Sequence, residues 1–343
     1  MTKTIEIDGA RGEGGGQVLR TSLALSLITR KPFHLRNVRA GRAKPGLQAQ
    51  HLMSVQAAAK IGNAKTRGAH LQSTDLVFEP GKVKAGDFHF KIGTAGATSL
   101  VLHTIYLPLA LAGGESNVTI EGGTHVKASP CFHFLERSWI AYMNALGIRI
   151  HLHMDRAGFY PRGGGSFSAR IEPCACIAPF QGMTTDKITN AMIIAGSASL
   201  PAHVSERMIE QARLRLEVLS LDVESSTQTW HGGPGCMLGI ELPTSPAPTF
   251  FFALGEKGKP AEMVAHEAAD QVEAFLKTQP LGVDEHSADQ LLLPLALAEG
   301  TSAFRVAAIS SHLMTNAAVV RLFVDRGIQL DGSVGGPGVA RIG

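Results

Sequence analysis

Residues 9–20 spell GARGEGGGQVLR, a glycine-rich string that runs into an apolar stretch. Glycine lets a backbone approach a ligand closely, and the amides at the start of a helix attract anions. Glu13 lies inside the string, and a lone carboxylate near cations can hold a divalent metal ion that bridges phosphates. The lysine and the serine or threonine that complete a P-loop are absent. The string therefore also fits a plain glycine turn, with Glu13 as a first-turn charge.

A second stretch, SSHLMTN at residues 310–316, has a histidine where a helix is expected to begin. Ser310 and Ser311 are natural N-caps, which places His312 in the first helical turn. The positive end of a helix disfavours the imidazolium form, so the ring would stay neutral and nucleophilic near neutral pH. A single histidine is more often structural, and the sequence position alone leaves both interpretations open.

A third polar cluster lies in EHSADQLLLPLA, at a turn before an apolar helix. It contains His286, Asp289 and Gln290. Such groups can contact a base or orient a phosphate. The alternative is a capping turn with Asp289 near the start of the helix.

Positive charge is concentrated near the N-terminus, although the formal net charge is only +3. Residues 14–74 contain ten Lys or Arg and no acidic residue. A segment of one sign attracts anions such as phosphates or nucleic acid, but a solvated basic face has the same composition. Arg39 and Arg42 differ from the rest because VRAGRAKPG is a loop from which side chains can converge on one ligand.

Length and composition indicate a soluble globular protein. A chain of 343 residues allows two domains or one large one, and an apolar fraction of 44% is ordinary. No apolar run reaches the ~18–20 residues of a membrane span, and the start has no signal-peptide core. The four cysteines form no pair of C-x-x-C elements, which disfavours a zinc site. We therefore expect a cytoplasmic protein with no membrane partner.

Two kinds of helix recur three times along the chain. An apolar helix after a small-residue turn is expected within 12–27, 93–114 and 285–300, and an amphipathic helix within 46–62, 129–150 and 310–330. Each amphipathic helix is followed by a glycine suited to a C-cap, namely Gly62, Gly147 and Gly327. The pattern predicts three copies of one αβ unit. The glycine-rich GFYPRGGGSF at 158–167 is interpreted as the start of the third copy.

The spacing of the three glycines indicates an insertion. The first interval is 85 positions and the second is 180, an excess of 95 residues. We expect an α+β fold in which three repeated βαβαββ-like units form a large catalytic domain, residues 1–183 plus 277–343. Residues 184–276 carry a new strand–helix–strand pattern and a further helix, and are expected to form a small α/β inserted domain.

Six segments together resemble one protein family. DGARGEGGGQVLRTSLALS, VRAGRAKPGLQAQHL, IGTAGATSLVL, GFYPRGGG, the ADQLLLPLALA run and SSHLMTN occur in this order in RNA 3'-terminal phosphate cyclases. The resemblance covers essentially the whole chain, including the place and size of the insertion. It implies ATP-dependent conversion of an RNA 3'-terminal phosphate to a 2',3'-cyclic phosphodiester. ATP would be the co-substrate, RNA 3'-phosphate ends the substrates, and Mg or Mn the divalent metal.

The resemblance also implies three chemical steps. A histidine attacks the α-phosphorus of ATP, which gives a covalent adenylyl-histidine and releases pyrophosphate. The RNA 3'-phosphate then takes the AMP. The neighbouring 2'-hydroxyl finally attacks that activated phosphate and expels AMP. Nucleophilic catalysis of this kind divides one difficult transfer into easier ones.

Residue by residue, the resemblance places the nucleophile at His312 and the metal-binding acid at Glu13. Nucleotide or phosphate contacts are implied for Arg20, Arg39, Arg42, Gln50, His51, His103, Pro130, His286, Ser287, Ala288, Asp289 and Gln290.

Some of these positions have a more specific implied role. Pro130 and His286 would form the two sides of the adenine slot, and some members have tyrosine in place of His286. Asp289 would be a partner of His312 or of the nucleotide. His103 stands where some members have glutamine.

Three other functions are compatible with parts of the sequence. A non-catalytic relative that serves ribosome assembly would lack the histidine nucleophile, so His312 argues against it. An enolpyruvyl transferase on a related repeat architecture would need no ATP, and the histidine motif disfavours it. A plain RNA-binding module leaves the cluster of motifs unexplained.

Overall fold

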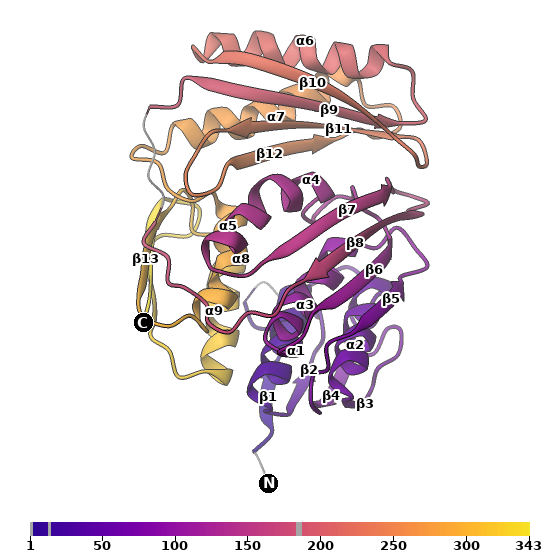
Figure 1. The fold of residues 1–343 in the computed structure, drawn as a ribbon, viewed down its shortest axis with the longest axis vertical. Helices are drawn as coiled ribbons and strands as arrows, with labels where there is room; N and C mark the ends of the chain where they lie inside the picture. Colours follow the sequence, from indigo (N-terminus) through magenta and orange to yellow (C-terminus); the bar gives the residue numbers. More distant parts are fainter. Residues whose placement is uncertain (1–2, 13–14, 183–186) are drawn as a thin grey trace.

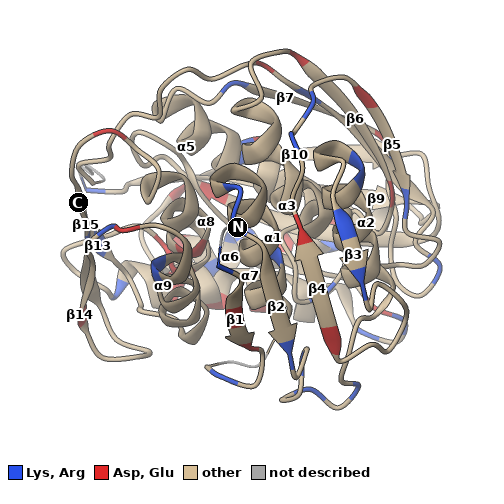
Figure 2. Ribbon diagram, turned by 90° about the horizontal axis from the view of Figure 1, so that it is seen from below, with Lys and Arg blue, Asp and Glu red and all other residues tan. Residues whose placement is uncertain are grey.

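The computed structural model describes residues 3–12, 15–182 and 187–343. Three small sheets lie at the outside of a large body, and a fourth sheet lies beyond the body at one end (Figure 1). Helices fill the space between the three sheets of the body, as the view from below shows (Figure 2). The sheets therefore act as a shell that positions the central helices.

The first sheet has the strand order β1-β2-β4-β3. Its strands are β1 (Ile5–Asp8), β2 (Phe33–Arg36), β3 (Lys65–Arg67) and β4 (Asp75–Glu79). β1 and β2 are parallel because α1 (Gly16–Thr29) crosses between them, whereas β2 and β3 both run antiparallel to β4. With α2 (Ala49–Gly62) between β2 and β3, the unit has the order βαβαββ.

The second sheet repeats this arrangement with the order β5-β6-β8-β7. Its strands are β5 (Asp87–Lys91), β6 (Ser116–Gly122), β7 (Ile150–Arg156) and β8 (Gly165–Ile171). α3 (Thr98–Ala110) connects the parallel pair β5 and β6. The second helix is formed by α4 (Phe132–Phe134), the π-helical turn η1 (Leu135–Trp139) and α5 (Ile140–Ala145).

The third sheet has the order β13-β15-β14. Its elements are α8 (Glu285–Leu295), β13 (Ser302–Val306), α9 (Ser311–Phe323), β14 (Ile328–Gly332) and β15 (Gly338–Ile342). A parallel bridge between Val283 and Val306 takes the place of the first strand. The fold is thus α+β with three repeated units, as expected.

A further sheet and two helices follow the second unit. They are β9 (Asn190–Ala198), α6 (His203–Val218), β10 (Asp222–Trp230), β11 (Gly235–Leu242), β12 (Thr249–Leu254) and α7 (Ala261–Leu276), and we call them the inserted domain. Alternate side chains of its sheet enter different cores. Ile193 and Leu238 pack with α6 and α7, whereas Ile194 and Met237 join the core of the body. The domain boundaries at residues 184 and 276 stay a prediction.

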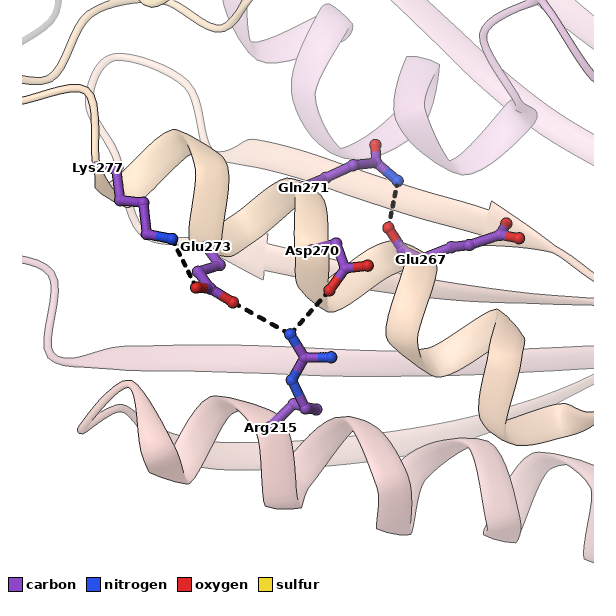
Figure 3. A network of polar contacts seen from close by, with 6 residues as sticks. All are labelled: Arg215, Glu267, Asp270, Gln271, Glu273 and Lys277. Carbon is purple, nitrogen blue, oxygen red and sulfur yellow. Dashed lines mark hydrogen bonds and ion pairs between the residues drawn. The ribbon is translucent and has the colours of Figure 1, made fainter.

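Exposed ion pairs connect α6 and α7 (Figure 3). Arg215 of α6 lies 2.8 Å from an oxygen of Asp270 and 3.1 Å from an oxygen of Glu273 on α7, and Lys277 also pairs with Glu273. Exposed pairs contribute little to stability, so the apolar core beneath the helices holds them in place.

Two expectations drawn from glycines are wrong. The segment 158–167 does not begin the third unit, because it leads into β8, which lies between β6 and β7 in the second sheet. Only Gly147 has the left-handed conformation expected after an amphipathic helix (φ 81°). Gly62 is the last residue of α2 and lets it pack on α1, since a Cβ there would come within 2.1 Å of Leu27 Cδ2. Gly327 lies beyond the end of α9.

Within the described residues, no helix is both long enough and apolar enough to cross a bilayer.

Candidate active site

The start of α9 carries His312, as the sequence predicted. Ser310 is the N-cap, and its Oγ accepts the backbone N–H of Leu313 at 2.9 Å. His312 therefore lies in the first helical turn, with an exposed face. Desolvation lowers the pKa of this histidine, Asp289 opposes that shift, and the positive charges of Arg20 and Arg42 add to it. The ring is accordingly neutral at neutral pH. The sequence led us to expect that the positive helix end would keep it neutral, but the causes are burial and the two arginines.

Asp289 of α8 is connected to the same helix cap. The Ser310 hydroxyl, which caps α9, also donates to Asp289 Oδ1 at 2.6 Å. Burial raises the pKa of the Asp289 carboxyl to about 6, against the opposing effects of Ser310, His312 and His286. One serine hydroxyl thus fixes the carboxylate of one helix relative to the histidine of the next.

The start of α8 is capped by Asp284 and not by the polar residues that follow it. Asp284 Oδ1 accepts the backbone N–H groups of His286 and Ser287 at 3.0 and 2.9 Å. The Ala288 N–H donates to the Asp284 carbonyl, and Ala288 is fully buried. His286 is exposed and lies 3.7 Å from Glu285, whereas the buried Ser287 Oγ has no hydrogen-bond partner among the described residues. The exposed ring of His286 is therefore free to contact a flat ligand.

Arg20 lies at the centre of the cluster, on α1. It lines a pocket together with Gln17, Thr21, His103, Tyr106, Asp289, Gln290, Leu293 and Asn316. Its guanidinium donates to Gln17 Oε1 at 2.8 Å, and no described acidic residue forms an ion pair with it. Burial and the charge of Arg39 lower the pKa of Arg20 to about 10. A partly buried cation without a carboxylate partner among the described residues is suited to an anionic ligand.

Gln50 and His51 begin α2 and connect it to its neighbours. Gln50 Oε1 accepts the Ala97 N–H at 2.8 Å, at the start of α3. His51 Nδ1 accepts the Gln48 N–H, which leaves the proton on Nε2. Burial, Arg20 and Arg39 lower the pKa of His51 to about 3. His51 is thus a neutral donor beside two cations.

The loop between β2 and α2 carries the other two predicted arginines. Arg39 has a left-handed backbone (φ 56°), and its side chain donates to the carbonyls of Lys44 at 2.6 Å and Gly46 at 2.9 Å. Arg39 therefore holds the loop in shape while its charge acts on Arg20 and His51. Arg42 is exposed, and its charge acts on His312.

His103 and Pro130 come from the second unit. His103 is buried on α3 against Tyr106 and Trp139, and its Nε2 has no partner among the described residues. Burial and Arg20 lower its pKa to about 3. Pro130 is half-buried and directly precedes Cys131, the N-cap of α4.

Glu13, the predicted metal-binding acid, lies outside the described residues. Its neighbour Gly12 has a left-handed backbone (φ 65°), and a Cβ there would come within 2.4 Å of Thr315 Oγ1 on α9. Gly12 therefore lies against the helix that carries His312. Among the described residues, no group of three or more His, Cys, Asp or Glu could hold a metal ion.

Comparison with known proteins identifies the family. The model of one family, RNA 3'-terminal phosphate cyclase, matches residues 11–330. The chain belongs to the RNA 3'-terminal phosphate cyclase family.

Proteins with that name are similar to this chain over most of its length. A relative from Salmonella agona is 42% identical over 332 residues, which covers 94% of this chain and 93% of the relative. A relative from Methanopyrus kandleri is 39% identical over 346 residues and covers 98% of each chain. A third, from Caldivirga maquilingensis, is 41% identical over 335 residues, 95% of this chain and 94% of the relative.

The candidate site also contains residues that sequence reasoning missed. Thr21 Oγ1 of α1 donates to Asn316 Oδ1 at 2.7 Å, and Asn316 Nδ2 donates to the Asp289 carbonyl at 3.2 Å. Asn316 thus joins three helices in the wall of the pocket. Its spacing of four residues from His312 could have indicated it, because such residues share a helix face.

Proposed function

We propose that this protein converts an RNA 3'-terminal phosphate to a 2',3'-cyclic phosphodiester with ATP as co-substrate. Membership of the RNA 3'-terminal phosphate cyclase family supports the reaction. The observation that carries the proposal is a neutral histidine, His312, placed next to a carboxylate and to arginines. Such a ring can attack phosphorus while the neighbouring cations attract phosphates.

In the first step, a ring nitrogen of His312 forms a bond to the α-phosphorus of ATP. The bond from that phosphorus to the bridging oxygen breaks, and pyrophosphate leaves with the electron pair. The imidazole becomes positively charged and keeps its other ring proton until the bond to the adenylyl group breaks, which restores the neutral ring. Asp289 is ionised above about pH 6 and stabilises this charge.

In the second step, an oxygen of the RNA 3'-phosphate attacks the adenylyl phosphorus, and the bond to His312 breaks. In the third, the RNA 2'-hydroxyl attacks the activated 3'-phosphorus, its proton leaves to solvent, and AMP departs. Positioning of the phosphates and neutralisation of their charge supply most of the remaining catalysis. We assign that role to Arg20, Arg39 and Arg42.

The adenine would lie between Pro130 and the exposed ring of His286. Gln290 and His103 line the pocket beside Arg20 and would contact the nucleotide. The Ser287 Oγ and His103 Nε2 lack partners among the described residues, which fits a ligand that brings polar atoms. The buried Ala288 would shape the floor, and His51 would donate from Nε2 to a phosphate.

A divalent ion, Mg or Mn, would neutralise phosphate charge when bound. Its proposed ligands are Glu13 and Gln50. Gln50 Oε1 keeps a lone pair beyond its bond to Ala97, which fits a ligand role.

The nucleophile is tested with ATP labelled at the α-phosphate. Wild-type protein and a divalent metal should give acid-labile label on the protein, and His312→Ala should abolish it, well beyond the ~10²–10³ loss from one electrostatic donor. His153→Ala, on the exposed strand β7, serves as the matched control and should label normally. Absence of label on the wild type contradicts the adenylyl-enzyme route. Equal labelling of His312→Ala contradicts the nucleophile assignment.

A further inference from the structure

The loop at residues 124–131 lies between the proposed nucleotide site and the inserted domain. It connects β6 to α4, is closed by a bond from the Phe132 N–H to the Thr124 carbonyl at 3.0 Å, and carries Pro130. Val126 packs against Ala97 and Leu100 at the start of α3. The same Ala97 donates its N–H to Gln50. The position of this loop is therefore coupled to residues of the site.

A buried chain of hydrogen bonds ties this loop to β10 of the inserted domain. Thr124 Oγ1 lies 2.8 Å from His125 Nδ1, His125 Nε2 lies 2.9 Å from His133 Nδ1, and His133 Nε2 lies 3.0 Å from Gln228 Oε1. Thr124 Oγ1 also accepts the Gly158 N–H at 2.9 Å.

The donors and acceptors in this series of hydrogen bonds follow one direction. The Gln228 oxygen can only accept, so His133 Nε2 donates to it. His133 Nδ1 then accepts from His125 Nε2, and His125 Nδ1 accepts from the Thr124 hydroxyl. With both rings neutral, every ring nitrogen has a partner. Burial lowers the pKa of His133 to about 4 and that of His125 well below its ordinary value, which keeps them so.

Trp230, at the end of β10, stacks on His125 and packs at a tilt against His133. Its ring centroid lies 5.0 Å from that of His125 and 4.7 Å from that of His133. Its Nε1 donates to the same Gln228 oxygen at 3.1 Å. Gly196 makes room for the indole, because a Cβ there would come within 1.9 Å of it. The glycine at position 196, the ring contacts and the hydrogen bonds thus all support the same placement of Trp230 against the two histidines.

A second contact reaches the loop from the surface. Lys127 pairs with Glu256, in the segment between β12 and α7, at 2.5 Å. Both side chains are largely exposed. The inserted domain thus contacts the loop at two places, and the buried one carries most of the energy because exposed pairs contribute little.

We propose that the inserted domain positions the loop that carries Pro130, with Gln228 as the positioning residue. Apolar burial alone would fasten the domain to the body without fixing its orientation. A fully satisfied chain of buried hydrogen bonds fixes that orientation, because any slip leaves a buried polar group unpaired. The inference rests on the proposed function in that Pro130 borders the adenine.

The test compares variants by the ATP concentration that gives half-maximal adenylylation of the protein. Gln228→Leu keeps the volume and removes the acceptor, and should raise this concentration roughly threefold to tenfold, as expected for one buried hydrogen bond. The rate at saturating ATP should stay near that of the wild type, because Gln228 does not touch the reacting atoms. A merely destabilised protein would instead lose active fraction at all ATP concentrations.

The matched control is Glu241→Gln, which removes the Arg137–Glu241 contact of 3.7 Å at the same junction but outside the loop. It should leave ATP dependence unchanged. Unchanged half-saturation in Gln228→Leu, or an equal rise in Glu241→Gln, overturns the inference. If Gln228→Leu does not fold at the assay temperature, Gln228→Met, which also removes the acceptor, replaces it and should raise half-saturation relative to Glu241→Gln; an unchanged value overturns the inference.

Failure of the proposed function is distinguishable from failure of this inference. If the wild type takes up no covalent label, the adenylyl-enzyme route is wrong. Equilibrium binding of labelled ATP to the same variants then decides the positioning role. Weaker binding by Gln228→Leu than by Glu241→Gln supports it, and equal binding contradicts it.

Discussion

Asp289 and His312 are neighbours whose charges depend on each other, and this sets how the site responds to pH. Burial raises the pKa of Asp289 to about 6, so the carboxylate is present above that pH and lost below it. The pKa of His312 is lowered, so the ring becomes protonated only at a pH below its ordinary value. Adenylylation needs the ionised carboxylate and the neutral ring. Its rate should therefore fall as the pH drops through about 6.

Variants at Asp289 and at Ser310 should shift the acidic limb of the pH–rate profile in opposite directions. Asp289→Asn removes the charge that supports imidazolium, so the limb should move to lower pH while the maximal rate falls roughly tenfold to hundredfold. Ser310→Ala removes the hydrogen bond that lowers the Asp289 pKa, so the limb should move to higher pH. The measurement is the single-turnover adenylylation rate from pH 5 to 9. A limb that stays in place in both variants would show that other groups control it.

The start of α1 is shaped by a close approach that only glycine allows. A Cβ at Gly16 would come within 2.6 Å of His51 Nε2 and 2.8 Å of Arg20 Nη1. Gly16→Ala should favour the helix by propensity but displace both side chains, so ATP affinity should fall without loss of thermal stability. Gly233→Ala is the control, because a Cβ there meets nothing within 4 Å. Unchanged ATP half-saturation in Gly16→Ala would mean that the two side chains do not bind the phosphates.

At the level of helices and strands, the sequence predicted much of the fold and part of the candidate site. Hydrophobic periodicity located the three pairs of helices, because it depends on neighbours three and four residues apart. The glycine pattern misplaced residues 158–167, since a glycine turn looks alike in any unit and strand pairing is not a local property. The hydrogen bond between Thr21 and Asn316 joins residues 295 positions apart, so the local sequence of neither segment predicts it. The roles assigned to the site residues came from the resemblance and stay predictions.

The body and the inserted domain share a core, which has a consequence for the whole molecule. One face of the inserted sheet, including Ile194 and Met237, is buried with the body, and the other with α6 and α7. Separating the two would expose apolar surface on both sides and break the buried histidine chain. We therefore expect them to unfold together in one cooperative transition.

The chain offers a direct test because it has two tryptophans. Trp139 is buried in the body, and Trp230 lies in the inserted domain at the junction. Trp230→Phe leaves a reporter of the body, and Trp139→Phe leaves a reporter of the junction. In each variant, the fluorescence midpoint in urea should coincide with the midpoint from far-ultraviolet circular dichroism. A Trp230 signal that is lost at lower urea than the circular dichroism would show that the junction opens first. The inserted domain would then be a mobile partner of the body, and a loop held by it could not be fixed in place.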